Sequence, residues 1–212
     1  MNLTRDGRSW LLAGAICAAA FFVLAQGPTN GAAAIALKGL SVALLAAFAL
    51  ARAEGADGRL LTGIMLLSAA GDVGIELDQV VGGVLFLLSH VAAIVLYMRN
   101  RRVRTTPSQR AAGAALLILV PLLAWLLSGA LVTIVYGLAL GGMAAAAWTS
   151  RFGRYRVGLG ALLFVASDLL IFARLGGWIE PATTGWMVWP LYYLGQAMIC
   201  TGVVRTLRVG KT

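Results

Sequence analysis

The chain of 212 residues is too apolar for a water-soluble domain, because 60% of its residues are hydrophobic, 12% are charged and the mean hydropathy is +0.89. Soluble globular domains carry about 25% charged residues, so this chain could not cover a water-exposed surface. The net charge of +9 at pH 7 would suit a nucleic-acid-binding protein, but most Lys and Arg residues fall in short segments between apolar stretches. The composition therefore indicates a polytopic membrane protein with no nucleic-acid partner.

Eight apolar stretches are long enough to span a membrane. A spanning helix needs roughly 20 mostly apolar residues. The predicted helices cover, to within about 2–4 residues at each end, residues 9–26, 31–51, 60–77, 79–98, 111–127, 129–149, 157–175 and 185–204. The expected fold is all-α: one transmembrane domain over residues 1–212, built as a bundle of eight helices.

The number of basic residues alternates between high and low in successive segments between the predicted helices. The segments outside the predicted helices hold, in order, 2, 0, 2, 0, 5, 0, 3, 1 and 3 Lys or Arg residues, where Arg174 at the very end of the seventh helix is counted with the segment that follows it. Lys38 lies inside the second helix. Because cytoplasmic loops carry excess Lys and Arg, this alternation predicts cytoplasmic termini in a bacterial-type inner or plasma membrane. Alternatively, Met1–Gln26 is a cleaved signal peptide, which would leave seven helices. The lack of a clean Ala-x-Ala site before Gly27 favours a retained helix.

The two halves of the chain share a weak internal similarity. Three pairs of segments align: Leu66–Asp72 with Leu162–Asp168, Leu85–His90 with Leu191–Gln196, and Lys38–Leu40 with Tyr136–Leu138. Each pair crosses the membrane in the same direction, as a parallel 4+4 repeat requires. Leu- and Ala-rich helices also match by chance, so the evidence for a repeat is that polar positions fall in register.

Five polar side chains lie inside the predicted helices: Lys38, Asp72, His90, Asp168 and Gln196. Ionisable groups cost about 2.5–3.5 kcal/mol each on membrane-insertion scales, which makes them functional candidates. At a rise of 1.5 Å per residue, the five lie roughly 8–16 Å from the outer helix ends. This depth predicts one polar cavity open to the non-cytoplasmic side. Glu76 and Asp78 fall at an outer helix end, where solvent alone explains them.

Each of these residues also has a structural explanation. Lys38 could extend its stem to the outer headgroups, and Asp72 could be merely its counter-ion. His90 and Gln196 could hold helices together by hydrogen bonds. Asp168 is harder to explain in this way, because no cation precedes Arg174 in its helix. If Lys38 keeps Asp72 ionised while Asp168 holds a proton, the two carboxyl groups suit acid–base chemistry.

Other chemistries fit the sequence less well. The chain has one histidine, no HExxH motif and no paired-cysteine spacing, so His90 with the two aspartates is the remaining arrangement for zinc. There is no GxSxG motif, and the adjacent side chains of Ser89 and His90 diverge around a helix. We therefore expect no metal and no cofactor, and an activity that survives chelation.

Four ordered motifs resemble the YhhN-like lysoplasmalogenase family over about residues 31–205. They are the segments 68–72 (SAAGD), 86–90 (FLLSH), 160–168 (GALLFVASD) and 192–196 (YYLGQ), together with the lysine in the second helix. Family members often have Lys-Pro where this chain has Lys38-Gly39, and an aromatic residue soon after the histidine where it has Val91-Ala92-Ala93. The first difference affects how the helix presents its lysine, and the second affects the acyl-chain pocket.

The resemblance implies an integral-membrane ether hydrolase of lipid metabolism that cleaves the vinyl-ether bond of lysoplasmalogens. It implies a lysophospholipid substrate in the lipid bilayer and Asp72 and Asp168 as the catalytic pair. The residues that it places along the substrate are Lys38, His90, Tyr192 and Gln196.

A competing class is a proton-coupled transporter of small molecules or lipids. Parallel repeats and a buried lysine with two aspartates would suit proton-coupled export as well. A non-catalytic scaffold is a third reading, but it leaves the buried carboxyl groups unexplained. A hydrolase should release aldehyde in detergent, whereas a carrier needs two compartments.

Overall fold

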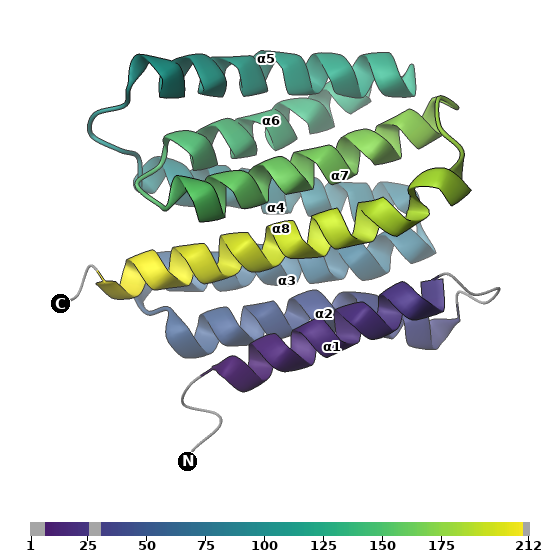
Figure 1. Ribbon diagram of the computed structural model, residues 1–212, viewed down its shortest axis with the longest axis horizontal. Coiled ribbons are helices and arrows are strands. Elements are labelled where there is room, and N and C mark those ends of the chain that lie inside the picture. Colours follow the sequence, from purple (N-terminus) through teal and green to yellow (C-terminus); the bar gives the residue numbers. More distant parts are fainter. Residues whose placement is uncertain (1–6, 26–30, 210–212) are drawn as a thin grey trace. The chain divides into compact units, whose positions relative to one another are not determined.

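The chain folds into helices joined by short connections in the computed structural model, which describes residues 7–25 and 31–209 (Figure 1). The helices are α1 (Arg8–Ala25), α2 (Ala32–Arg52), α3 (Gly55–Leu77), α4 (Gln79–Arg99), α5 (Pro107–Ser128), α6 (Thr133–Thr149), α7 (Leu159–Leu175) and α8 (Pro181–Val209). A short π-helix, η1 (Arg154–Gly158), leads directly into α7. Among the described residues, seven helices are long and apolar enough to cross a membrane, and α6 is a shorter apolar helix of 17 residues. The all-α membrane fold expected from the sequence is confirmed.

Helix ends differ from the predicted ones where local capping decides them. α5 begins at Pro107, because the Thr106 side chain accepts a hydrogen bond from the Gln109 N–H while the Gln109 side chain accepts one from the Thr106 N–H. α5 ends at Ser128, because the Gly129 that caps it has a left-handed φ of 71°. A turn then delays the start of α6 to Thr133. The segment 27–30 between the first two predicted helices and the alternative cleavage point before it lie outside the described residues.

The chain divides into two compact units. The first comprises Met1–Ala92 with Val203–Thr212, and the second comprises Ala93–Gly202. Each has its own apolar core. Val42, Leu45, Leu61 and Met65 are fully buried in the first unit. Leu96, Leu140, Phe152 and Cys200 are fully buried in the second unit.

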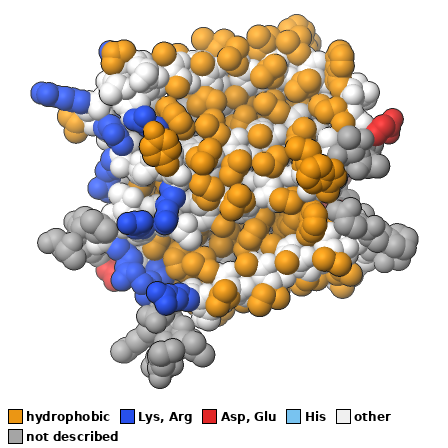
Figure 2. Space-filling view, viewed as in Figure 1, with side chains coloured by type: hydrophobic (Ala, Val, Ile, Leu, Met, Phe, Trp, Pro, Cys, Tyr) orange, Lys and Arg blue, Asp and Glu red, His pale blue; other side chains and the backbone are white. Residues whose placement is uncertain are grey.

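Large apolar side chains also cover the outside of the helices. Leu12, Val80, Ile118 and Leu126 are each more than half exposed. Figure 2 shows hydrophobic side chains over the helix faces, with Lys and Arg at helix ends. Water would disfavour so much exposed apolar surface, whereas lipid tails match it. The chain is an integral membrane protein.

Glycines bring the helices that carry the polar residues close together. In the first unit, a Cβ on Gly82 of α4 would collide with the backbone of Ile75 on α3. In the second unit, a Cβ on Gly160 of α7 would lie 2.8 Å from the Gly195 carbonyl oxygen of α8, and one on Gly195 would lie 2.7 Å from the Gly160 oxygen. The two helix pairs α3·α4 and α7·α8 therefore pack backbone against backbone.

Candidate functional site

The six predicted site residues fall into two groups of three. Lys38, Asp72 and His90 belong to the first unit, and Asp168, Tyr192 and Gln196 belong to the second. Five of the six are buried, with relative exposures of 2% for Asp72, His90 and Gln196, 5% for Tyr192 and 7% for Asp168. The Lys38 side chain is partly exposed.

Lys38 forms an ion pair with Glu76 of α3. Its Nζ lies 2.5 Å from Glu76 Oε1 and 5.7 Å from the ring centroid of Phe21 on α1. We expected Asp72 as the partner, and the structure corrects this. Glu76 lies one helical turn beyond Asp72, so both carboxyl groups are on the same face of α3. Lys38 reaches along its stem toward the helix end, and Glu76 has a structural role that the sequence did not suggest.

α2 lies close against α3 beside Asp72. A Cβ on Gly39 would lie 2.5 Å from the Val73 side chain and 3.3 Å from the Ala69 carbonyl oxygen. Glycine at this position, rather than any larger residue, therefore allows the close approach. The helix that carries Lys38 is consequently packed directly on the turn of α3 that carries Asp72.

A buried serine pair fixes α4 against α3. The hydroxyl groups of Ser68 and Ser89 lie 2.8 Å apart, and Ser89 Oγ donates to the Ile64 carbonyl oxygen at 3.1 Å. Ser68 is one turn before Asp72, and Ser89 is the residue before His90. The serine pair therefore holds the α3 turn of Asp72 in register with the α4 turn of His90. Neither serine was predicted to have this role.

In the second unit, Asp168 is hydrogen-bonded to a tyrosine of a neighbouring helix. The Tyr136 hydroxyl on α6 donates to Asp168 Oδ2 at 2.8 Å, and its ring meets Phe172 edge-on at a centroid distance of 5.7 Å. Asp168 has no cationic partner nearby in its own helix, and nothing in the sequence around Tyr136 marks that tyrosine as its partner. The one signal that could have found it is the alignment of Lys38–Leu40 with Tyr136–Leu138, which places Tyr136 at the position equivalent to Lys38.

Tyr192 belongs to an aromatic cluster between α7 and α8. Its ring centroid lies 5.1 Å from that of Phe164, one turn before Asp168, and 5.5 Å from that of Trp189. Gln196 Nε2 donates to the Tyr192 hydroxyl at 3.4 Å, so the structure brings these two predicted residues together. The cluster forms an apolar wall one turn from Asp168.

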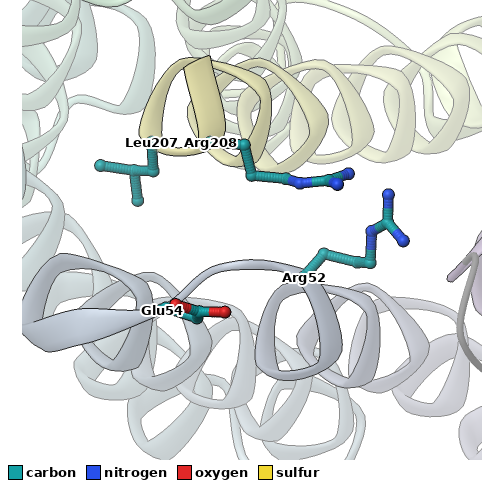
Figure 3. A pocket seen from close by; sticks show the side chains of 4 residues that line it. All are labelled: Arg52, Glu54, Leu207 and Arg208. Carbon is teal, nitrogen blue, oxygen red and sulfur yellow. The ribbon is translucent and has the colours of Figure 1, made fainter. Parts of the chain in front are cut away.

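A small cavity in the first unit lies away from these residues. It has a volume of about 110 Å³ and is lined by Arg52, Glu54, Leu207 and Arg208 (Figure 3). Within residues 7–25 and 31–209, no three His, Cys, Asp or Glu side chains are grouped as metal ligands would be. Each unit contains one of the two buried aspartates, Asp72 in the first and Asp168 in the second.

The fold and these buried groups define an integral-membrane helical protein with ionisable residues inside its spanning segments. Residues 33–203 match the model of the YhhN family, and this range contains all six predicted site residues. The chain belongs to the YhhN family. No curated protein and no solved structure matches the chain significantly.

Proposed function

We propose that this YhhN-family protein hydrolyses the vinyl-ether bond of lysoplasmalogen-type lysophospholipids, giving a fatty aldehyde and a glycerophospho-alcohol. The observation that carries the proposal is the presence of two buried aspartates, Asp72 on α3 and Asp168 on α7. Carboxyl groups inside membrane-spanning helices are costly and mark functional sites. We further propose that both aspartates act on one substrate.

The reaction needs an acid, a water molecule and a base. The acid protonates the β-carbon of the vinyl ether, and the C=C electron pair forms the new C–H bond. The resulting oxocarbenium ion takes up water at its α-carbon, and the base accepts the proton that water loses. The hemiacetal hydroxyl then gives its proton to the acid residue, which is a carboxylate after the first step. The bond from this carbon to the glycerol oxygen breaks, the glycerol oxygen takes the proton held by the base, and the aldehyde leaves with both residues in their starting states. Carboxylate pairs in glycosidases act through similar oxocarbenium-like states.

We assign the acid role to Asp168 and the base role to Asp72. Because Lys38 pairs with Glu76, a charge contact with Lys38 does not distinguish the two aspartates. The contact that supports the assignment is the one from Tyr136, which holds Asp168 Oδ2 at 2.8 Å. A carboxyl group oriented through one oxygen presents the other in a defined direction, and orientation of this kind is a large part of catalysis.

The remaining predicted residues suit an amphiphilic substrate. A lysoplasmalogen carries its vinyl ether a few bonds below the headgroup, which matches the predicted depth of roughly 8–10 Å for the aspartates. The aromatic wall of Phe164, Trp189 and Tyr192 suits the alkenyl chain. Lys38 at its partly exposed position suits the phosphate, while His90 and Gln196 would line the deeper part of the site.

Aldehyde release by purified protein in detergent tests the proposal. With a lysoplasmalogen as substrate, Asp72→Asn and Asp168→Asn should each lower kcat by about 10²–10⁴-fold, the range of general acid–base contributions. KM should change far less, because the proton transfers occur in the transition state. Glu180→Gln removes an exposed carboxylate and is the matched control. Wild-type protein that releases no aldehyde, or aspartate variants with unchanged kcat, would contradict the proposal.

A proton-coupled carrier is the second candidate. The observation that favours it is the division of the chain into two compact units, each with one buried aspartate. A carrier would release no aldehyde in detergent, but would move lysophospholipid across the membrane of a sealed vesicle in response to a pH gradient. The two assays on one preparation therefore separate the candidates.

A further inference from the structure

One end of the second unit carries a dense and unbalanced positive charge. Five arginines lie at the end of α4, in the α4–α5 connection and in the first turn of α5: Arg99, Arg101, Arg102, Arg104 and Arg110. Three more lie between α6 and α7: Arg151, Arg154 and Arg156. We call these eight residues the arginine surface. The sequence contains no Asp or Glu from Ala93 to Ser167, so no acidic side chain of these segments balances them.

The α4–α5 connection and the segment between α6 and α7 are joined by backbone hydrogen bonds. Arg101 and Ser150 form an isolated antiparallel bridge, and the Arg102 N–H donates to the Thr149 carbonyl oxygen at 3.3 Å. The Arg151 N–H donates to the Asn100 carbonyl oxygen at 2.8 Å. The eight arginines therefore lie on one braced structure and not on two independent loops.

Side chains also tie the two connections together. Arg151 Nε donates to Asn100 Oδ1 at 2.7 Å, and the buried Asn100 Nδ2 donates to the Leu96 carbonyl oxygen at 3.0 Å. The Arg154 guanidinium lies 5.5 Å from the ring centroid of Trp148. Its buried Nε has no hydrogen-bond partner among the described residues. These bracing contacts use neutral partners, namely Asn100, backbone carbonyl groups and the Trp148 ring.

The surface is accessible and has apolar residues within it. Arg102, Arg104, Arg110 and Arg156 are exposed. Val103 and Tyr155, each flanked by arginines in the sequence, are 98% and 81% exposed. An exposed aromatic residue and an exposed aliphatic residue among arginines suit the membrane interface, where rings and aliphatic groups enter the headgroup layer and guanidinium groups meet phosphates.

We propose that the arginine surface binds the anionic phospholipid headgroups of the leaflet that it faces, in preference to zwitterionic ones. The positive charges of neighbouring arginines repel one another, and anions bound between them offset this repulsion. Guanidinium groups bind phosphate oxygens in bidentate geometry. Each basic residue close to an anionic leaflet gains attraction that decays within a Debye length. The braced connections hold these groups together at one end of the second unit.

Lipid binding to the full-length protein in detergent tests this proposal. Native mass spectrometry would give the apparent Kd for phosphatidylglycerol and for phosphatidylcholine, with inorganic phosphate as a third ligand. Wild-type protein should prefer phosphatidylglycerol, and added salt should weaken that preference. The variant Arg102→Gln/Arg104→Gln/Arg110→Gln/Arg156→Gln should bind phosphatidylglycerol at least about tenfold more weakly, with phosphatidylcholine binding unchanged.

The first unit offers a matched control. The variant Arg8→Gln/Arg59→Gln/Arg205→Gln/Arg208→Gln also removes four exposed arginines, which lie near the ends of α1, α3 and α8. Unlike the arginine surface, this unit has acidic residues at the start of α3, namely Glu54 at its N-cap and Asp57 in its first turn. Its loss of phosphatidylglycerol affinity should be much smaller. Equal losses in both variants, or displacement of the lipid by inorganic phosphate, would overturn the proposal. If the first variant does not fold, wild-type protein without a salt-sensitive preference for phosphatidylglycerol overturns it as well.

Discussion

At the scale of single residues, the contact between Tyr136 and Asp168 connects two helices of the second unit through a neutral donor. A buried carboxyl group without a hydrogen-bond partner is costly, and the phenol supplies one without adding a charge. The same ring packs edge-on against Phe172. The hydroxyl and the ring of Tyr136 therefore have separable roles, one at Asp168 and one in packing.

Tyr136→Phe should lower kcat for aldehyde release by about tenfold, the effect of losing one hydrogen bond of this kind. The protein should lose no more stability than one buried hydrogen bond supplies, about 1–3 kcal/mol, because the contact between the ring and Phe172 remains. Steady-state kinetics and thermal unfolding of the same preparation measure both effects. Tyr155→Phe, the same change at an exposed position, is the control and should match wild type. An unchanged kcat in Tyr136→Phe would show that this hydrogen bond does not contribute to catalysis.

The ion pair between Lys38 and Glu76 should be weak but measurable. Their side chains are 14% and 28% exposed, and partly exposed pairs typically contribute no more than about 1 kcal/mol. A double-mutant cycle of Lys38→Met and Glu76→Gln should therefore give a coupling free energy of unfolding of about 0.5–1 kcal/mol. A second cycle with Asp72→Asn should give less. Larger coupling of Lys38 with Asp72 would restore Asp72 as the partner of Lys38.

The predictable part of the candidate site was the position of its polar groups, and the unpredictable part was their partners. Asp72 and Asp168 stand out because a charged residue in an apolar helix is visible in the sequence. Glu76 lies at a helix end, where a carboxylate is ordinary, and Tyr136 resembles any aromatic residue of a spanning helix. Which of them meets Lys38 or Asp168 depends on how neighbouring helices are rotated, and spacing within one helix does not give this rotation.

At the scale of helices, the approach of α7 to α8 depends on the absence of two side chains. The carbonyl oxygen of each glycine, Gly160 and Gly195, occupies the space that a Cβ on the other would need. Membrane helices pack closely through such small residues, because lipid offers no hydrophobic force to bring them together. This contact lies next to the aromatic wall formed by Phe164 and Tyr192.

Gly195→Ala should destabilise the protein by about 1–3 kcal/mol, because the added methyl group forces α7 and α8 apart. Gly185→Ala makes the same change in the same helix where nothing lies within 4 Å. This control should be neutral or slightly stabilising, since alanine favours a helix more than glycine does. Thermal unfolding in detergent measures both variants. Equal stabilities would show that the α7–α8 contact tolerates a methyl group.

Helix identity was predictable from hydropathy, whereas some helix ends were not. The start of α5 was predicted too late, although Thr106, Pro107 and Gln109 together form a capping signal that is present in the sequence. The start of α6 was predicted too early, because Ala130, Leu131 and Val132 are apolar yet lie before the helix. Hydropathy describes the environment of a segment, and capping residues determine where its backbone becomes helical.

At the scale of the whole molecule, the side of the membrane on which the chain ends depends on whether the shorter helix α6 crosses the membrane. Its 17 residues span about 25 Å, less than the roughly 30 Å of a hydrocarbon core. Within the second unit, however, the bridge between Arg101 and Ser150 joins the end of α6 to the α4–α5 connection, and a Cβ on Gly113 near the start of α5 would lie 3.2 Å from the Thr149 side chain at the end of α6. The hydroxyl groups of Ser128 and Thr133 lie 2.8 Å apart where α5 turns into α6. α6 therefore runs back along α5 and should cross the membrane.

If α6 crosses, the eight helices return the chain to its starting side, and the basic segments place that side in the cytoplasm. A reporter fused after Thr212 should therefore be cytoplasmic, as should one inserted in the α4–α5 connection after Val103. A reporter inserted after Ala130, between α5 and α6, should be exported. Paired reporters that are active only in the cytoplasm or only outside it would measure all three positions. A cytoplasmic signal after Ala130 would mean that α5 and α6 do not both cross. An exported signal at Thr212 together with a cytoplasmic one after Val103 would mean that the helices after Val103 cross an odd number of times, and the assigned sides of α7 and α8 would then be wrong.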